Sequence, residues 1–253
     1  MTQRVLITAG ANGIGLAMAE AFSDAGAQVW IADIDAAALA AAPDAWRRSE
    51  LDASDEKQVA GLFDKIAADW GGLDVLCANA GVAGPTAGIE QVDLADWRRC
   101  IAVNLEGAFL TAKHVAPMMR RQGGGSIVFT SSTAGLYGYP NRAPYCAAKW
   151  GVIGLMKTVA MELGPHGVRA NAICPGAVEG PRMEGVLERE AAAKGTTRDA
   201  IYSGYAAGSS MRSWVTAADV AGMAVFLGSD AARLISGQVI AVDGHTENPD
   251  PKV

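Results

Sequence analysis

The chain carries no long apolar run, no basic run and little net charge. With a formal net charge of −6 and no cluster of Lys and Arg, a surface for duplex nucleic acid is excluded. The longest apolar stretches are broken by Lys157 and Glu162, so none is long enough to cross a bilayer. The N-terminus enters a strand-like run at Arg4, without the apolar core or cleavage site of a signal peptide. We therefore expect a soluble cytoplasmic protein with neither a nucleic-acid partner nor a membrane partner.

The cysteines and histidines are few and scattered. The four cysteines form no C-x-x-C pair, so we expect buried free thiols in a reducing compartment: Cys77, Cys100, Cys146 and Cys174. No two of the three histidines are spaced as metal ligands, and no metal site is expected.

Apolar runs of strand length alternate with segments of helical period along the whole chain, half of which is hydrophobic. The expected strands are 5–8, 28–32, 47–51, 73–78, 126–131, 169–174 and 238–242. The expected helices are 13–25, 36–42, 56–70, 97–122, 144–163 and 217–228, with Pro117 bending or dividing the fourth. This order predicts an α/β protein: a single-domain, doubly wound Rossmann-type fold with a seven-stranded parallel sheet and helices on both faces. Residues 1–253 form one domain in this prediction, and its ligands should lie beyond the carboxyl ends of the strands.

A glycine-rich turn follows the first expected strand. In Thr8-Ala9-Gly10-Ala11-Asn12-Gly13-Ile14-Gly15, the glycines let the backbone approach a pyrophosphate at the start of a helix. Asp33 ends the second strand about 20 residues later, the position from which an acid binds the ribose diol of NAD. No Lys or Arg lies between Gly10 and Asp33 to hold the 2′-phosphate of NADP. Although an ordinary strand-end turn would also accommodate Asp33, its position favours NAD.

A tyrosine and a lysine share one face of an expected helix, in Tyr145-Cys146-Ala147-Ala148-Lys149. A tyrosine with a pKa near ~10 is a poor base at neutral pH, but a nearby ammonium favours the phenolate. On its own this spacing is common, and an aromatic ring packing on a lysine stem would explain it. Ser131 and Ser132, however, end the fifth strand and can direct a hydroxyl into the same crevice.

Together these residues resemble the short-chain dehydrogenase/reductase family over nearly the whole chain. The matching motifs are the turn Thr8–Gly15, Asn79-Ala80-Gly81, Asn104 in Val103-Asn104-Leu105-Glu106-Gly107, Ser132, Tyr145, Lys149 and Pro175-Gly176. The resemblance implies an NAD-dependent dehydrogenase or ketoreductase, with the nicotinamide giving or taking a hydride. Tyr145 is then the general acid or base, and Lys149 lowers its pKa and binds the nicotinamide ribose. Ser132 orients the substrate oxygen, and Asn104 holds a water in a proton relay toward Lys149.

The resemblance also implies a set of cofactor-binding residues. Asp52 should contact the adenine, Asn79 the adjoining ribose, and Val178 the carboxamide through its backbone. The full expected set is Gly10, Asn12, Gly13, Ile14, Gly15, Asp33, Ile34, Asp52, Ala53, Asn79, Ala80, Gly81, Tyr145, Lys149, Pro175, Gly176 and Val178.

Three positions depart from the family pattern. Ala9 stands where the family has glycine, and we expect the turn to survive the extra methyl group. Ala78 precedes Asn79 where an asparagine pair is common, which costs one strand-bridging hydrogen bond. Gly180 replaces a threonine that binds the nicotinamide amide, so cofactor affinity or lid closure should differ.

The substrate half of the family varies, so the substrate has to be inferred from this chain. Residues 179–213 are the expected substrate lid, and 246–253 a surface tail. The lid is rich in charged and small residues, which favours a small polar substrate such as a sugar, polyol or hydroxy acid. Arg182 and Arg142 could pair with a carboxylate, phosphate or sulfonate, although either could equally be a solvated surface residue.

Other functions and assemblies remain open at this stage. An epimerase or dehydratase with retained NAD would use the same fold, and a non-catalytic NAD-binding regulator would keep the cofactor site alone. The resemblance implies a homotetramer, with a dimer as the second possibility, and small residues on the two long helices would permit close packing across a two-fold axis.

Overall fold

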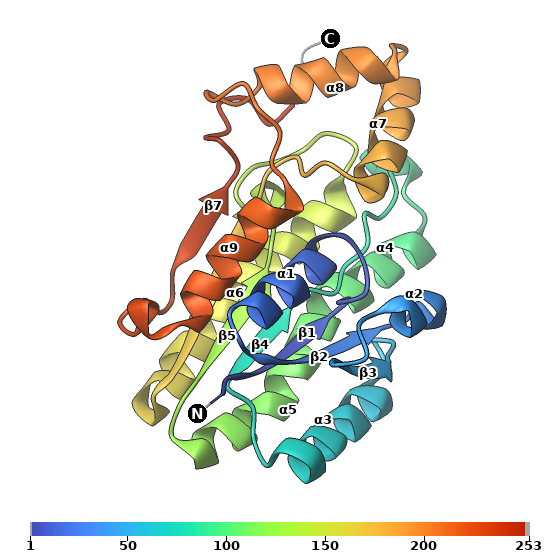
Figure 1. The fold of residues 1–253 in the computed structure, drawn as a ribbon. Helices are drawn as coiled ribbons and strands as arrows, with labels where there is room; N and C mark the ends of the chain where they lie inside the picture. Colours follow the sequence, from blue (N-terminus) through green and yellow to red (C-terminus); the bar gives the residue numbers. More distant parts are fainter. Residues whose placement is uncertain (1, 251–253) are drawn as a thin grey trace.

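The computed structural model describes residues 2–250 and contains one sheet of seven parallel strands, in the order β3-β2-β1-β4-β5-β6-β7. The strands are β1 (Arg4–Thr8), β2 (Gln28–Asp33), β3 (Arg47–Glu50), β4 (Val75–Ala78), β5 (Gly125–Thr130), β6 (Val168–Pro175) and β7 (Val239–Val242). The chain leaves β1 toward β2 and β3 and then returns to the other side of β1 as β4 (Figure 1). This reversal leaves a crevice at the carboxyl ends of β1 and β4, as the alternation of elements predicts.

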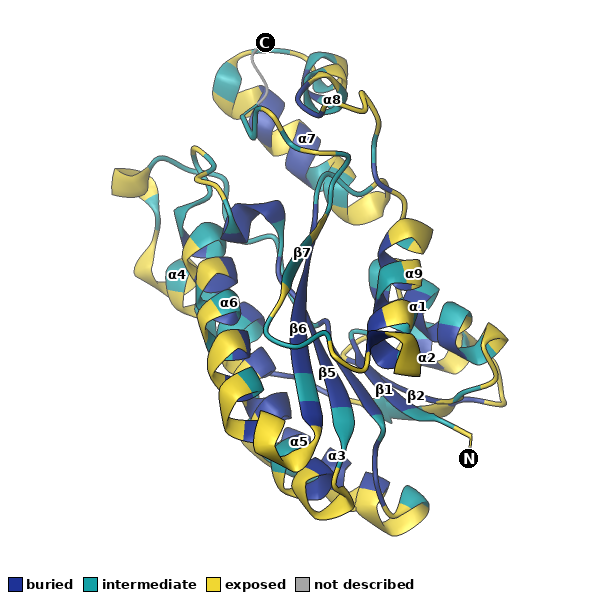
Figure 2. Ribbon diagram, turned by 90° about the vertical axis from the view of Figure 1, so that its left-hand side faces the viewer, coloured by how far each residue is buried: buried dark blue, intermediate teal, exposed yellow. Residues whose placement is uncertain are grey.

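Helices cover both faces of the sheet (Figure 2). The helices are α1 (Gly13–Asp24), α2 (Ala36–Ala41), α3 (Glu56–Trp70), α4 (Leu94–Ile101), α5 (Gly107–Gln122), α6 (Ala143–Leu163), α7 (Pro181–Lys194), α8 (Arg198–Ala207) and α9 (Ala217–Gly228). One apolar layer joins the sheet to α3, α5 and α6, and the other joins it to α1, α2 and α9. Alternate residues of one strand enter different layers: Leu6 enters the first, whereas Val5 and Ile7 enter the second, and all three are fully buried. The Rossmann-type prediction is confirmed.

The expected long helix 97–122 differs from the structure. It begins earlier, at Leu94, and its regular hydrogen bonding is interrupted by a π-helical turn over Ala102–Glu106, which joins α4 to α5. Pro117 lies inside α5, so of the two effects expected of it, bending or dividing the helix, division does not occur. The extra residue of the π turn widens the helix locally, and such turns often occur at functional positions.

Helices α7 and α8 form a separate small layer above the carboxyl ends of the strands (Figure 1). Its own apolar cluster contains Leu187 and Ile201, with Tyr202, Tyr205 and Trp214 packed beside them. The described part of the expected tail, residues 246–250, lies against this layer. Glu247 and Asn248 donate their backbone N–H groups to Gly208 O, and Asp250 forms an ion pair with Lys194 at 2.6 Å. The rest of the tail, 251–253, lies outside the described residues.

The four cysteines are free thiols, as the sequence predicts. Three of them are buried, and burial raises the pKa of the Cys77 thiol to about 12. Cys146, on α6, is only half-buried. Within residues 2–250, no helix is both long and apolar enough to cross a membrane.

Candidate active site

A cavity of about 550 Å³ lies at the carboxyl ends of the central strands. At one end it is lined by Asp33 and Asp52, and at the other by Ser132, Tyr145 and Lys149. All the predicted site residues line this one cavity except Gly10 and Asn104. Its elongated lining joins the glycine turn to the Ser–Tyr–Lys group, so a dinucleotide bound at the turn would reach the tyrosine.

The glycine turn is shaped by contacts too close for a larger residue. A Cβ atom on Gly15 would lie 1.9 Å from the carbonyl oxygen of Ala9, and one on Gly10 would lie 2.8 Å from Ile31 Cγ2. Gly13 has a φ of +52° and starts α1. The first residues of this helix line the cavity, and the first backbone N–H groups of a helix have no partner within it. The turn therefore offers bare backbone and a positive helix end, which is the arrangement that binds a pyrophosphate.

The turn survives the replacement of glycine by alanine at position 9, although with strain. Ala9 has a φ of 48°, in the left-handed region where a Cβ atom costs about 1 kcal/mol or more. Neighbouring hydrogen bonds hold the segment. The Thr8 hydroxyl accepts from the backbone N–H groups of Asn79 and Ala80 at 3.0 and 3.1 Å, and the Asn79 amide donates to the carbonyls of Thr8 and Ala9. Asn79 thus supports the turn as well as lining the cavity, and a single asparagine is enough to bridge β1 and β4.

Asp33 ends β2 and is nearly buried, with an exposed fraction of 8%. Its carboxylate accepts the backbone N–H of Ala11 at 3.0 Å and that of Asp35 at 3.1 Å. Each carboxylate oxygen keeps a further lone pair, and Asp33 lines the cavity. An acceptor held this firmly at the cavity wall can accept hydrogen bonds from a ribose diol.

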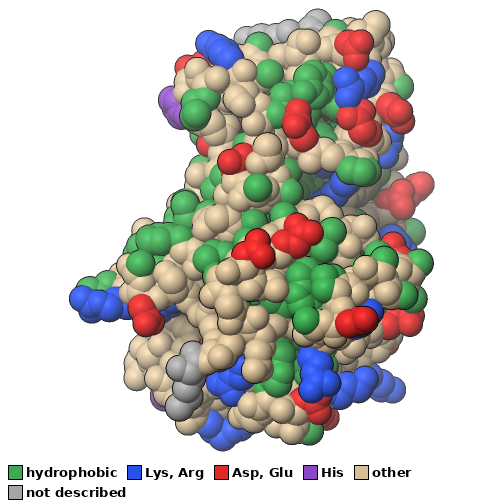
Figure 3. All heavy atoms as spheres, viewed as in Figure 1, with side chains coloured by type: hydrophobic (Ala, Val, Ile, Leu, Met, Phe, Trp, Pro, Cys, Tyr) green, Lys and Arg blue, Asp and Glu red, His purple; other side chains and the backbone are tan. Residues whose placement is uncertain are grey.

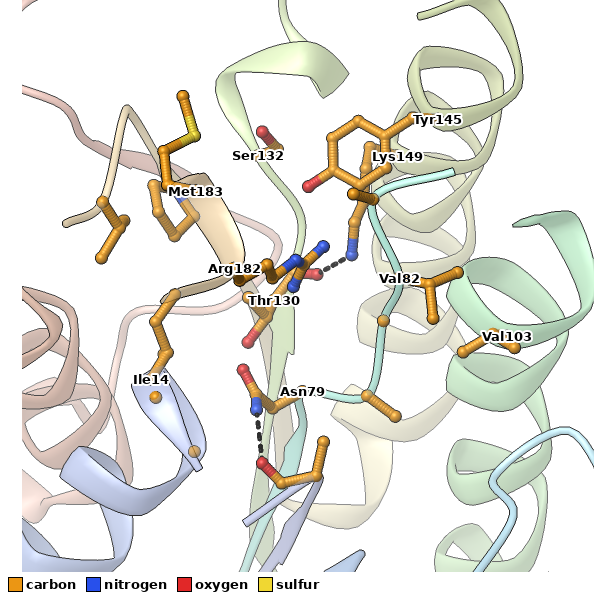
Figure 4. Close-up of a pocket in the computed structure, with 18 of the residues that line it drawn as sticks. Ile14, Asn79, Val82, Val103, Thr130, Ser132, Tyr145, Lys149, Arg182 and Met183 are labelled. Carbon is orange, nitrogen blue, oxygen red and sulfur yellow. Dashed lines mark hydrogen bonds between the residues drawn. The ribbon is translucent and has the colours of Figure 1, made fainter. Parts of the chain in front are cut away.

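Lys149 is buried and donates from Nζ to the carbonyl oxygen of Thr130 at 2.8 Å. Four residues before it on α6, Tyr145 lies on the same face, with its ring centroid 5.7 Å from Lys149 Nζ (Figure 4). Burial lowers the pKa of Lys149, while the neighbouring phenol acts in the opposite direction. Thr130 ends β5, so the strand and the helix together fix the ammonium beside the phenol.

Burial opposes ionisation of the Tyr145 phenol, but the positive charges of Lys149, Arg182 and Arg142 outweigh it. A hydrogen bond from Ser132 adds to their effect, and the pKa of Tyr145 falls below its ordinary value of 10.0. Ser132 follows β5 and its Oγ also accepts the backbone N–H of Ala134, which fixes its rotamer at the start of a short 3₁₀ turn. The site therefore holds an acidified phenol next to a positioned hydroxyl.

Asn104 lies behind the cavity wall, within the π turn between α4 and α5. Its Nδ2 donates to the carbonyls of Val82 at 3.0 Å and Cys100 at 2.9 Å. Its Oδ1 is buried and has no hydrogen-bond partner among residues 2–250. A Cβ atom on Gly81 would lie 2.6 Å from this oxygen and 3.3 Å from Lys149 Nζ, so the two groups face the same small space.

Gly180 has a φ of +141°, a conformation that is nearly restricted to glycine, and precedes the first turn of α7. A threonine at this position would be strained. The backbone conformation at the start of α7 therefore requires the glycine that stands here in place of the family's threonine.

Several cavity residues carry no sequence signal. Tyr139 and Tyr205 line the cavity together with Arg99, Met183 and Val186. Burial raises the pKa of Tyr139 to about 12, and its hydroxyl is 2.7 Å from that of Thr133. This second tyrosine is therefore uncharged at neutral pH and only forms part of the cavity wall. Only the position of these residues on loops and on α4, α7 and α8 brings them to the cavity, and no motif marks that position.

The doubly wound sheet, the glycine turn and the adjacent serine, tyrosine and lysine define a dinucleotide-dependent dehydrogenase. A family profile described as enoyl-(acyl carrier protein) reductase matches residues 8–245. The chain is 38% identical over 245 residues to cis-4-hydroxycyclohexanecarboxylate dehydrogenase of Sinomonas cyclohexanicum, with 94% of each chain covered. It is also 38% identical over 246 residues to (+)-borneol dehydrogenase 1 of Salvia officinalis, covering 94% of this chain and 91% of that one.

A solved structure, NAD⁺-bound xylitol dehydrogenase, superposes with a TM-score of 0.92 at 29% identity and covers 96% of this chain and 98% of the other. The chain belongs to the short-chain dehydrogenase/reductase family and is an oxidoreductase acting on CH–OH groups.

Proposed function

We propose that the protein is an NAD-dependent dehydrogenase of a small polar secondary alcohol, or the reductase of the matching ketone. The observation that carries this proposal is the acidified Tyr145 phenol beside the buried Lys149 and Ser132. Nicotinamide at this end of the cavity would accept the hydride from the alcohol carbon. Ser132 holds the substrate oxygen, and the Tyr145 phenolate takes its proton.

The residues present fit NAD. Backbone N–H groups at the start of α1 and the close contacts of Gly10 and Gly15 suit a pyrophosphate, and Asp33 suits a ribose without a 2′-phosphate. Lys149, which donates to the carbonyl oxygen of Thr130, would bind the nicotinamide ribose and stabilise the phenolate. The unpartnered Oδ1 of Asn104 supports its role in a water-mediated proton path to Lys149.

The relatives support an alcohol substrate and differ in its polarity. Their names specify a hydroxy acid, a terpene alcohol and a polyol. In this chain, Arg142 and Arg182 lie at the substrate end, which favours a polar substrate over a terpene.

The assembly is part of the proposal. We infer a homotetramer, or a dimer, in which the long helices form the contact. Phe109 on α5 and Trp150 and Met161 on α6 are exposed large apolar side chains, and Met161 is 81% exposed. Burial of such side chains between subunits would stabilise the assembly.

The function is tested by following NADH absorbance with the purified full chain across sugars, polyols, hydroxy acids and secondary alcohols. We expect NADH formation with at least one class and much less NADPH formation from NADP. Tight NAD binding with no turnover in either direction on any of these compounds would contradict the dehydrogenase proposal.

The pH dependence follows from the lowered pKa of Tyr145. Since oxidation needs the phenolate, kcat/KM for the alcohol should rise with pH and level off above a midpoint below 10.0, the ordinary value for tyrosine. The Lys149→Met variant loses the nearest cation, so its residual activity should show a midpoint raised by about one unit or more.

Lys157→Met is the matched control for this measurement. Lys157 is an exposed lysine of α6 that bonds to Gly237 O, and its loss should leave the midpoint in place. An equal shift in both variants would contradict the assignment of Lys149.

A further inference from the structure

The substrate end of the cavity contains more positive than negative charge. Its described lining includes Lys149 and three arginines, Arg99, Arg142 and Arg182, but only one acid, Glu179. Glu179 accepts a hydrogen bond from the Tyr202 hydroxyl at 2.7 Å, so it is turned toward α8. The other acids of the lining, Asp33 and Asp52, lie at the opposite end with the second and third strands. The reacting end therefore has an unbalanced positive potential.

Arg142 is held against the reacting phenol. Its Cζ lies 5.0 Å from the centroid of the Tyr145 ring, and its Nη2 donates to the carbonyl oxygen of Ala83 at 3.1 Å. Its Nε is buried and has no hydrogen-bond partner among residues 2–250. A buried N–H of a charged group is costly to leave unpaired, and no carboxylate among the described residues compensates the charge of Arg142, so an anion in the cavity that Arg142 lines would balance it.

Arg182 approaches the same space from the other side. It lies in the first turn of α7, and Figure 4 shows its side chain extending across the pocket toward Thr130 and Lys149. No ion pair or hydrogen bond of Arg182 is present in the described part of the chain, whereas Arg198 of the neighbouring α8 pairs with Glu184 and Asp199. An extended cation beside two others, without a carboxylate of the protein to balance it, indicates a site for an anion.

The cofactor phosphates do not account for this charge. The pyrophosphate site is at the start of α1. The charge of Arg182 instead lowers the pKa values of Tyr145 and Lys149, which lie at the other end of the cavity. Arg142, stacked on the Tyr145 ring, is likewise at the reacting end. The anion that these two arginines would bind is therefore on the substrate.

We propose that the substrate is a hydroxy acid, or the corresponding keto acid, whose carboxylate is bound between Arg142 and Arg182 while its hydroxyl lies between Ser132 and Tyr145. This inference rests on the proposed function. In the oxidation, the carbinol C–H bond breaks and its electron pair leaves as hydride to NAD⁺. The O–H proton passes to the Tyr145 phenolate, the C=O bond forms, and the carboxylate is unchanged. Guanidinium groups suit a carboxylate because their two parallel N–H donors match its two oxygens.

The test compares each acid with its neutral amide, which has nearly the same shape. The kcat/KM values with NAD are measured for β-hydroxybutyrate, mandelate and a hydroxycyclohexanecarboxylate, and for the primary amide of each. The protein should prefer at least one acid over its amide by about tenfold to a hundredfold, the range of a charge-assisted hydrogen bond. Arg182→Met and Arg142→Met should each reduce this preference by about tenfold.

The ratio of acid to amide cancels any general effect of the arginines on the Tyr145 phenol. Arg189→Met is the matched control: Arg189 is also on α7 but lines a separate groove with Glu90 and Asn141, and its loss should leave the ratio unchanged. The same measurements are made with glycerol phosphate, and a stronger preference for this phosphate ester would overturn the assignment to a carboxylate.

The two proposals fail in different ways. Turnover of amides or polyols that depends on Tyr145, with no preference for any acid, would overturn the carboxylate inference alone. A variant of Arg182 that weakens NAD binding and leaves the acid-to-amide ratio intact would also overturn it, by assigning the arginine to the cofactor. Absence of turnover with every acid, amide and neutral alcohol would count against the proposed function itself.

Discussion

Replacing Tyr145 with phenylalanine is expected to reduce kcat by about a thousandfold to ten-thousandfold. The change removes one oxygen from a group whose pKa is lowered chiefly by Lys149, Arg182 and Arg142 against the effect of burial. Without it, the substrate proton has no acceptor at the reacting position, and general acid–base catalysis of this kind contributes up to about 10⁴-fold. The ring itself remains, so its stacking with Arg142 should persist.

The measurement is single-turnover NADH formation together with an independent titration of NAD binding. The dissociation constant for NAD should change by no more than about threefold, because the phenol hydroxyl is not part of the pyrophosphate or adenosine end. Tyr137→Phe is the matched control, since Tyr137 is a partly exposed tyrosine that does not line the cavity. Activity of Tyr145→Phe within tenfold of the unaltered protein would show that another group transfers the proton.

The second large effect concerns the choice between NAD and NADP. A 2′-phosphate would meet the Asp33 carboxylate, which is nearly buried and fixed by the backbone N–H groups of Ala11 and Asp35. Such a contact between like charges costs several kcal/mol. We expect Asp33→Ser to change the ratio of NADP to NAD affinity by about a hundredfold or more, and Asp33→Ser with Ile34→Arg to change it further.

Both affinities are measured by titration of the purified protein, and Asp35→Ser is the control. Asp35 is an exposed neighbour that caps α2 through the backbone N–H of Ala38, and serine can cap a helix as well. Its replacement should leave the ratio within about threefold. An unaltered protein that binds NAD and NADP equally would contradict the role of Asp33.

The features that the sequence predicts well are those carried by local pattern. The apolar run of β1, the glycine turn and the spacing of Tyr145 and Lys149 each lie within a few residues, and the parallel topology follows from their alternation. The position of Asp33 at the end of a strand also has a local signal. In the structure, Asp33 and the residues of the glycine turn line the same cavity as Tyr145 and Lys149.

Other features depend on contacts between distant segments. The approach of Arg182 to Lys149 requires the path of α7 over the sheet, and the tail reaches Gly208 only because β7 leads it there. The sequence does not reveal the π turn, because no residue type marks it and it appears only as a one-residue shift in the apolar period between α4 and α5. For the same reason the sequence indicates Asn104 as a site residue but not the direction of its amide.

The π turn also limits how this part of the gene can change in length. Compared with an ordinary α-helix, Ala102–Glu106 contains one residue in excess. Removing it would rotate all of α5 by about 100° relative to α4, since each residue advances a helix by that angle. The amide of Asn104 would swing away from Gly81, and the apolar stripe of α5 would leave the sheet. We therefore expect single-codon deletions and insertions in this segment to be more disruptive than substitutions at its positions other than Asn104.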